Sequence, residues 1–216
     1  MDTKVVPERG WRGSAEIWLD AAYLLLVEGG VEAVKVMPMA ERLGLSRTSF
    51  YWHFADRDAL LAGLIARWQS HNTANLVAKT NLPAATITEA TLNLFDCWIM
   101  PDLFDSRMEF AIRTWALTDA DLGKTLAEVD ATRIAAIKTM FRRFGFADAE
   151  ADIRAHTIYL TQIGYISMRM SEPLLPRLER IPAYALTFTG LAPLPAEVAA
   201  FRARHIQASR ISNAIS

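Results

Sequence analysis

Apolar residues recur at helical spacing along most of the chain, and this pattern predicts an all-α fold. The helices predicted beyond residue 80 cover 84–99, 103–118, 121–144 and 148–171. We expect Pro173 and Pro176 to end the last of these helices. Further prolines predict an irregular C-terminal region, with a short helical piece near 183–189 and a helix over 196–208. No segment shows the apolar–polar alternation of a half-buried strand.

A pair of short helices is predicted nearer the N-terminus. The apolar face of the first helix consists of Val36, Met39, Ala40 and Leu43. Gly44 suits a left-handed cap for this helix, and Ser46 is a natural N-cap for the next. Phe50 and Phe54 lie four residues apart, so we expect both to face inward. Two short helices joined by a tight turn are the smallest unit that can place a helix in the major groove of DNA.

The other side chains of the second helix are polar or aromatic and fall on its outer side or its margins. They are Arg47, Thr48, Ser49, Tyr51, Trp52 and His53. These residues alone leave two interpretations open. Either this side faces DNA, or the segment is a buried helical hairpin in which Tyr51 and Trp52 belong to the core.

A third helix is predicted after this pair. Asp56 can cap it, and its apolar stripe continues to Trp68. Arg57 lies in the first turn, where a cation opposes the helix dipole, so we expect a compensating partner. A phosphate group would serve. Upstream of the pair, Ser14 can cap a further helix that runs through Val27.

Residues 14–68 resemble the N-terminal domain of the TetR family of bacterial transcriptional regulators. The resemblance is carried by Ala21-Ala22, Gly29, Met39-Ala40, Leu43-Gly44-Leu45-Ser46, Phe50-Tyr51-Trp52-His53-Phe54, Arg57 and Leu60-Leu61. It implies a three-helix helix-turn-helix DNA-binding domain over 1–58, whose closing helix runs on to about residue 70. It also implies a helical bundle over 59–216 for ligand binding and dimerisation. The implied function is a ligand-responsive repressor that binds double-stranded DNA as a homodimer on a palindromic operator.

The resemblance also assigns individual DNA contacts. The positions that match the contacts to bases or phosphates are Thr48, Ser49, Tyr51, Trp52 and His53. Arg47 lies at the exposed start of the same helix, where a guanidinium can pair with guanine. Arg57 matches the basic residue that clamps a phosphate from the next helix. The hydroxyl residue that usually starts the first helix of the pair is missing here, so we expect Lys35 to replace it by charge.

The charge of this part is not basic overall, because residues 1–57 hold one more Asp or Glu than Lys or Arg. Lys4, Arg9 and Arg12 nevertheless cluster before the first helix. They form either an arm that follows the DNA backbone or a minor groove, or a terminal tail without that role.

The predicted helix over 148–171 is the candidate dimer element, together with the C-terminal segment. Gly164 and Ser167 allow close helix approach. Apolar contact comes from Ile153, Leu160, Ile163 and Ile166. Two-fold pairing matches a palindromic operator that is read in successive grooves. The same helix also suits the centre of the bundle, and different faces can serve both roles.

Bulky or polar-tipped side chains on separate helices are candidates for the wall of an effector pocket. They are Trp98, Phe104, Met108, Trp115, Tyr159, Gln162 and Tyr165. Such side chains are typical of ligand cavities and also of cores. Gln162 and Tyr165 are the stronger candidates, because an amide or a phenol on an apolar helix needs a partner. We expect a small-molecule effector and no cofactor.

Composition narrows the class of protein. The 216 residues are 52% hydrophobic and 22% charged, with a net charge of −1, which is typical of a globular protein with local rather than general affinity for nucleic acid. The sequence starts without an apolar signal region and has no run long enough for a membrane span, so we expect a cytoplasmic protein without a membrane partner. The single cysteine, Cys97, lies in an apolar run and is expected in the core.

Signals of catalysis are weak. The four histidines have no metal-ligand spacing, and HExxH, G-x-S-x-G and Gly-rich phosphate-loop motifs are absent. Acidic residues at predicted helix starts, such as Asp119 and Asp148, are typical partners of helix dipoles. We therefore expect no enzyme and neither a catalytic nor a metal site. The alternative function is a helical protein-binding adaptor or a small helical enzyme without DNA binding.

Overall fold

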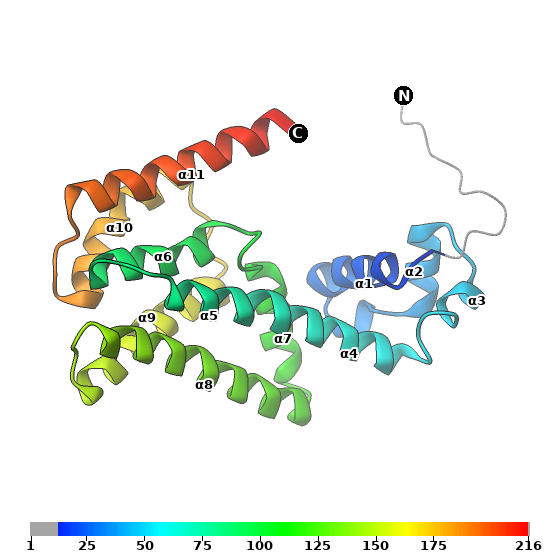
Figure 1. Ribbon diagram of the computed structural model, residues 1–216. Coiled ribbons are helices and arrows are strands. Elements are labelled where there is room, and N and C mark those ends of the chain that lie inside the picture. The colour runs from blue at the N-terminus through cyan, green and yellow to red at the C-terminus, as the bar shows by residue number, and fades with distance from the viewer. Residues whose placement is uncertain (1–12, 216) are drawn as a thin grey trace. The chain divides into compact units, whose positions relative to one another are not determined.

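The computed structural model describes residues 13–215, with side chains described up to residue 207, and every regular element in this range is helical (Figure 1). The α-helices are α1 (Ala15–Gly29), α2 (Val36–Leu43), α3 (Arg47–Phe50), α4 (Arg57–Trp68), α5 (Ala74–Asn81), α6 (Ile87–Ile99), α7 (Ser106–Ala116), α8 (Ala120–Arg143), α9 (Asp148–Ser167), α10 (Leu174–Thr189) and α11 (Pro195–Ile215). A 3₁₀ turn, η1 (Val31–Ala33), and a π-helix, η2 (Gln69–Thr73), complete the set. The predicted all-α class is confirmed for the described residues.

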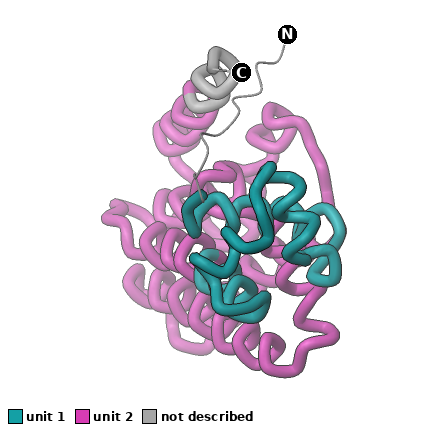
Figure 2. The backbone as a smooth tube through the Cα atoms, turned by 90° about the vertical axis from the view of Figure 1, so that its right-hand side faces the viewer, with its two compact units in different colours: residues 1–67 teal, residues 68–216 magenta. Residues whose placement is uncertain are grey.

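The chain divides into two compact units, Met1–Arg67 and Trp68–Ser216, which Figure 2 colours separately. The border follows Arg67, within the uninterrupted helical run formed by α4, η2 and α5. The sequence predicts a functional boundary after residue 58, which lies before this structural border in the chain. Whether the two units divide DNA binding and ligand binding between them stays a prediction.

The core of the first unit centres on aromatic rings that hold α3. Trp18 of α1 is fully buried and packs edge-to-face on Phe50, with ring centroids 5.4 Å apart. Phe50 also stacks with Phe54 at 5.6 Å. As predicted, Phe50 faces inward, whereas Phe54 is only half-buried. Burying one such ring contributes about 1.5–3 kcal/mol, which is enough to hold a helix that is too short to be stable alone.

Side-chain caps fix where several helices begin. The hydroxyl of Ser14 accepts a hydrogen bond from the Ile17 amide and starts α1, as predicted. Thr86 does the same for α6 through the Glu89 amide at 3.0 Å, so this helix begins at Ile87 rather than at residue 84. Such caps satisfy donors in the first turn that have no partner within the helix.

The second unit is a helical bundle. Helices α8 and α9 pack along each other, α5 packs against α6 and α8, and α10 packs against α6 and α9. The core side chains include Phe95, Cys97, Ile137, Phe141, Ile158 and Phe201. Cys97 is fully buried, as predicted, and burial raises the pKa of its thiol to about 12. The thiol is therefore protonated and unreactive near neutral pH.

A charged cluster lies inside this bundle. Glu109 of α7 and Arg133 of α8 are both fully buried and pair at 2.8 Å. The indole of Trp68 donates to Glu109 at 2.6 Å, and the amide of Asn72 donates to it at 3.0 Å. Burial alone would raise the pKa of Glu109, but the charges of Arg133 and Arg113 and the hydrogen bonds from Arg133 and Asn72 lower it below the usual value. The carboxylate therefore stays ionised and binds α7, α8 and η2 together.

The C-terminal region is more helical than predicted. The expectation of irregular structure with a short piece near 183–189 is wrong, because α10 spans Leu174–Thr189. Pro173 is the N-cap and Pro176 lies in the first turn, where a missing N–H removes no intrahelical bond. Pro182 does lie inside the helix. Its lost hydrogen bond is offset by the apolar face of α10, which buries Leu178, Ile181, Ala185 and Phe188.

The two neighbouring helices also have different ends from those predicted. Helix α9 stops at Ser167 rather than at residue 171, and Arg169 follows in the left-handed region with φ of 51°. Helix α11 runs to Ile215, beyond the predicted end at residue 208.

Candidate nucleic-acid interface and ligand cleft

The turn between α2 and α3 has the geometry that the sequence predicts. Gly44 adopts the left-handed conformation with φ of 64° and ψ of 28°, where a Cβ atom would be strained. The amide of Leu45 donates back to the Ala40 carbonyl at 3.0 Å and closes α2. Ser46 then caps α3 by accepting from the Ser49 amide at 3.3 Å. These bonds fix the angle at which α3 leaves the turn.

The outer side of α3 and of the turn that follows it carries large exposed side chains. Tyr51 is 47% exposed and Trp52 is 63% exposed, whereas His53 is half-buried. Arg47 is exposed and donates from Nη2 to the Tyr51 hydroxyl at 3.2 Å. The exposure of Tyr51 and Trp52 contradicts the alternative in which both rings belong to the core. Because α3 itself spans only four residues, Arg47–Phe50, these rings follow the helix rather than lie on it.

Two further residues that we expect to contact DNA are exposed, and a third is buried. Thr48 and Lys35 both face solvent, and Lys35 is the N-cap of α2 without a side-chain hydrogen bond. Ser49 was expected on the outer side but is only 5% exposed. Its hydroxyl donates to the Ser46 carbonyl at 2.6 Å, a local bond that short hydroxyl side chains often make. The predicted arm of Lys4, Arg9 and Arg12 lies outside the described residues.

Arg57 has a partner other than the phosphate that we expected. Its Nε–H donates to the Val34 carbonyl, and its Nη2–H donates to the Val31 carbonyl at 2.6 Å. The guanidinium therefore ties the start of α4 to η1 and to the residues just before α2. A cation in the first turn of a helix is compensated here by two backbone carbonyls of the same unit.

These features coincide with a known domain. Residues 19–64 match the model of the family described as bacterial regulatory proteins, tetR family. Residues 19–64 therefore form a TetR-family N-terminal domain. Over 61 residues it is 36% identical to the tetracycline repressor protein class A from transposon 1721 of Escherichia coli. That alignment spans 28% of this chain and 28% of the repressor.

Similar solved structures cover far more of the chain. A transcriptional regulator from Rhodococcus sp. Rha1 superimposes with a TM-score of 0.58 over 88% of this chain and 96% of that one, at 18% identity. A TetR-family regulator from Mesorhizobium loti gives 0.56 over 88% and 95%, at 15% identity. At such low identity, the likeness shows a shared fold that extends through the C-terminal bundle.

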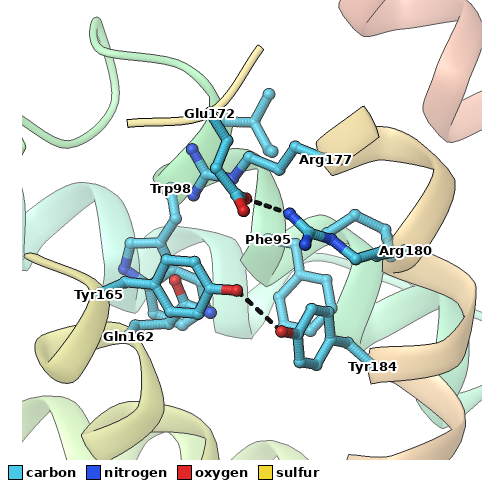
Figure 3. Close-up of a pocket in the computed structure, with 10 residues that line it drawn as sticks. Phe95, Trp98, Gln162, Tyr165, Glu172, Arg177, Arg180 and Tyr184 are labelled. Atoms are coloured by element: carbon cyan, nitrogen blue, oxygen red, sulfur yellow. Dashed lines mark hydrogen bonds and ion pairs between the residues drawn. The ribbon is translucent and has the colours of Figure 1, made fainter. Parts of the chain in front are cut away.

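The C-terminal unit contains a cleft between α6, α9 and α10 (Figure 3). Its lining residues are Phe95, Trp98, Ile99, Gln162, Tyr165, Glu172, Arg177, Arg180, Ile181 and Tyr184. The hydroxyls of Tyr165 and Tyr184 lie 2.8 Å apart, and this hydrogen bond raises the pKa of Tyr165. Glu172 forms an ion pair with Arg180. The cleft therefore combines aromatic walls with charged groups along α10 and the segment before it.

The structure brings together some of the predicted pocket residues and separates others. Trp98, Gln162 and Tyr165 line the cleft. Phe104, Met108, Trp115 and Tyr159 do not, and all four are buried. Tyr159 belongs to the charged cluster, because its hydroxyl donates to Asp130 at 2.6 Å and accepts from Arg133 at 3.1 Å. Sequence reasoning missed the lining residues of α10, since it did not predict that helix.

Residues 13–207 contain no group of three or more His, Cys, Asp or Glu side chains that is arranged to hold a metal ion. Across the helices that the structure describes, none combines the length and the apolar character needed to cross a bilayer.

Proposed function

We propose that this chain is a sequence-specific DNA-binding transcriptional regulator that acts as a homodimer on a palindromic operator and represses until a small molecule binds. The observation that carries this proposal is the exposed set Arg47, Tyr51 and Trp52 on a TetR-family helix-turn-helix. Leaving an indole largely in water forgoes the free energy of burial, and a DNA surface would recover part of it. No catalytic role is proposed.

The DNA contacts follow from the chemistry of the exposed groups. Arg47 offers a guanidinium for a guanine edge or a phosphate, and Thr48 offers a methyl group for thymine. Tyr51 and His53 are better suited to phosphates than to base edges, and Trp52 can contact either. Lys35 adds a charge at the start of α2. Arg57 acts indirectly, since its bonds to Val31 and Val34 hold the segment that leads into α2.

The homodimer is supported by an apolar face on α9 and α10. Ile153 and Leu160 of α9 are 66% and 59% exposed, and Leu186 of α10 is 46% exposed. Ile153 and Leu160 lie two helical turns apart, on one face of α9. A groove between these helices is lined by Ile153, Thr157 and Thr187, among other residues. Large apolar side chains exposed on neighbouring helices are typical of a protein interface.

Other residues predicted for the dimer contribute differently. A Cβ atom added at Gly164 would meet no other atom within 4 Å, so a second helix has room to approach there. Ser167 is exposed at the end of α9, and Ile163 is half-buried. Ile166, in contrast, is only 9% exposed and belongs to the core of its own bundle. The interface that we propose therefore centres on Ile153, Leu160 and the exposed side of α10.

An electrophoretic mobility shift tests this function. The probe is a palindrome from the DNA upstream of the gene, and binding is measured at 50 and 200 mM salt. We expect a sequence-specific shift that weakens by about 10³-fold or more with salt, since phosphate contacts release counterions. Tyr51→Ala should weaken the shift at least tenfold, whereas Leu117→Ala, at an exposed apolar position on the other unit, should leave it unchanged. An adaptor or an enzyme would give no specific shift, and that result would reject the proposal.

A further inference from the structure

The cleft between α6, α9 and α10 holds more positive than negative charge. Arg177 lies half-buried in its wall, and burial is the largest effect that lowers the pKa of its guanidinium. Among residues 13–207, no side chain or carbonyl forms a hydrogen bond or an ion pair with that guanidinium. The carboxylate in the same wall, Glu172, is paired with Arg180. Two cations thus share one anion, and a partly desolvated arginine whose nearest carboxylate is paired with another arginine favours an anionic ligand.

A second unpartnered group belongs to the same wall. Trp98 is 6% exposed and lines the cleft, and its indole N–H has no acceptor within the described part of the chain. Buried donors nearly always have a partner, because an unsatisfied one loses its hydration without compensation. A ligand oxygen in the cleft would satisfy this donor. Arg177 and Trp98 come from different helices. The lack of hydrogen-bond partners at both is therefore a property of the cleft and not of one local turn.

The rest of the wall is aromatic. Phe95 and Trp98 lie on α6 with ring centroids 5.9 Å apart, and Tyr165 and Tyr184 face each other from α9 and α10 (Figure 3). Flat rings of this kind favour a flat guest, through offset or edge-to-face contacts. Little of the cleft is empty, since its free volume is about 20 Å³, so a ring enters only by displacing the side chains that fill it.

We propose that the cleft binds a small aromatic monocarboxylate, whose carboxylate pairs with Arg177 and whose ring lies among Trp98, Tyr165 and Tyr184. The planar guanidinium can hold both carboxylate oxygens at once. Glu172 disfavours a dianion such as phosphate, because its own charge lies in the same wall. This inference rests on the proposed function only in taking the C-terminal unit as the place where an effector binds.

The test uses the full chain without DNA and titration calorimetry. The probes are 3-phenylpropanoate and 3-phenylpropanamide, which have the same shape and differ in charge. We expect the acid to bind the wild-type protein at least tenfold more tightly than the amide. Arg177→Met should remove this preference, and Arg177→Lys should keep part of it. The matched control is Arg107→Met, at an exposed arginine of α7 that does not line the cleft, and this variant should bind like the wild type.

Several results would overturn the inference. Equal binding of acid and amide, or an unchanged preference in a folded Arg177→Met protein, would show that Arg177 does not hold the carboxylate. Tighter binding of octanoate or of inorganic phosphate would reject the aromatic monocarboxylate class. No heat with any acid at 10 mM would reject the site. The comparison of acid with amide on the wild-type protein needs no variant, so a variant that fails to fold does not spoil it. Because DNA is absent, failure here leaves the mobility shift to decide the proposed function separately.

Discussion

The Nε–H of Arg57 donates to the carbonyl oxygen of Val34 at 2.7 Å. Val34 is fully buried and lies two residues before α2 begins, so this bond joins the first turn of α4 to the entry of the helix-turn-helix. A second bond from the same guanidinium to the Val31 carbonyl makes the connection rigid. A basic residue expected at the DNA backbone thus anchors the segment that leads into the helix-turn-helix that we propose to meet DNA.

Replacing Arg57 should therefore lower stability as well as DNA affinity. Arg57→Ala leaves two carbonyls without a charged donor, and we expect a loss of about 2–4 kcal/mol in the free energy of unfolding of the first unit. The measurement is urea unfolding followed by circular dichroism. Arg42→Ala is the control, because its pair with Glu28 is exposed and should contribute less than about 1 kcal/mol. Equal stability of both variants would show that the Arg57 bonds are unimportant.

Arg47 should matter for DNA and not for folding. The side chain is exposed, and its hydrogen bond and its cation–π contact both go to Tyr51, so Arg47→Ala should change the free energy of unfolding by less than about 0.5 kcal/mol. Losing one phosphate contact would reduce the slope of log K against log salt by about 1, whereas losing a guanine contact would relax specificity at one base pair. Fluorescence anisotropy with labelled operator across a salt series distinguishes the two results. Unchanged affinity at every salt concentration would remove Arg47 from the interface.

The apolar face of α9 should determine whether two copies of the chain form a dimer. Leu160→Glu puts a charge at a position that is 59% exposed in one copy and would be buried in a pair. A two-fold interface contains the substitution twice, so we expect dissociation to monomers in sedimentation equilibrium. Leu117→Glu, at a side chain that is 83% exposed after α7, should leave the dimer intact. A Leu160→Glu protein that still sediments as a dimer would move the interface elsewhere.

The buried carboxylate of Glu109 should make stability depend on acid. Because its pKa is lowered in the folded chain, its contribution is complete above the ordinary value of 4.5 and is lost as pH falls through the lower, folded value. Glu109→Gln leaves Arg133 buried without a counter-charge, and we expect a loss of about 3–5 kcal/mol at pH 7. Urea unfolding at pH 7 and pH 3 should show a smaller pH dependence in the variant than in the wild type. The exposed pair of Asp121 with Lys124 provides the control, with Asp121→Asn expected to change stability by less than about 1 kcal/mol.

Apolar spacing and capping residues were sufficient to predict α2 and the turn that follows it, but they were insufficient to predict α10. The apolar spacing predicts α2 over 36–43, where the structure has it, and Gly44 and Ser46 cap the two helices as expected. These features depend on residues within one or two turns of each other. Helix α10 was missed because Pro173, Pro176 and Pro182 are strong local breakers. Packing of its apolar face against α6 and α9 outweighs that local preference, and this packing is invisible in a single sequence.

What the sequence could not predict about the candidate sites also depends on tertiary contacts. The exposure of Tyr51 and Trp52 followed from their place outside the apolar face, but the burial of Ser49 depends on a hydrogen bond that no periodicity encodes. Side-chain type likewise cannot separate a cavity wall from a filled core. Tyr159 and Tyr165 lie on the same helix, yet one is locked among charged groups and the other lines the cleft.

The position of Cys97 has a practical consequence. It is the single cysteine of the sequence, and its thiol is both fully buried and protonated at neutral pH. Maleimide or methanethiosulfonate reagents should therefore leave the native chain unlabelled. A cysteine introduced at the exposed Trp52 position would take a spin label alone, without first mutating the natural thiol. Electron–electron distances between two labelled copies could then report how far apart the two recognition elements stand, with and without a small molecule.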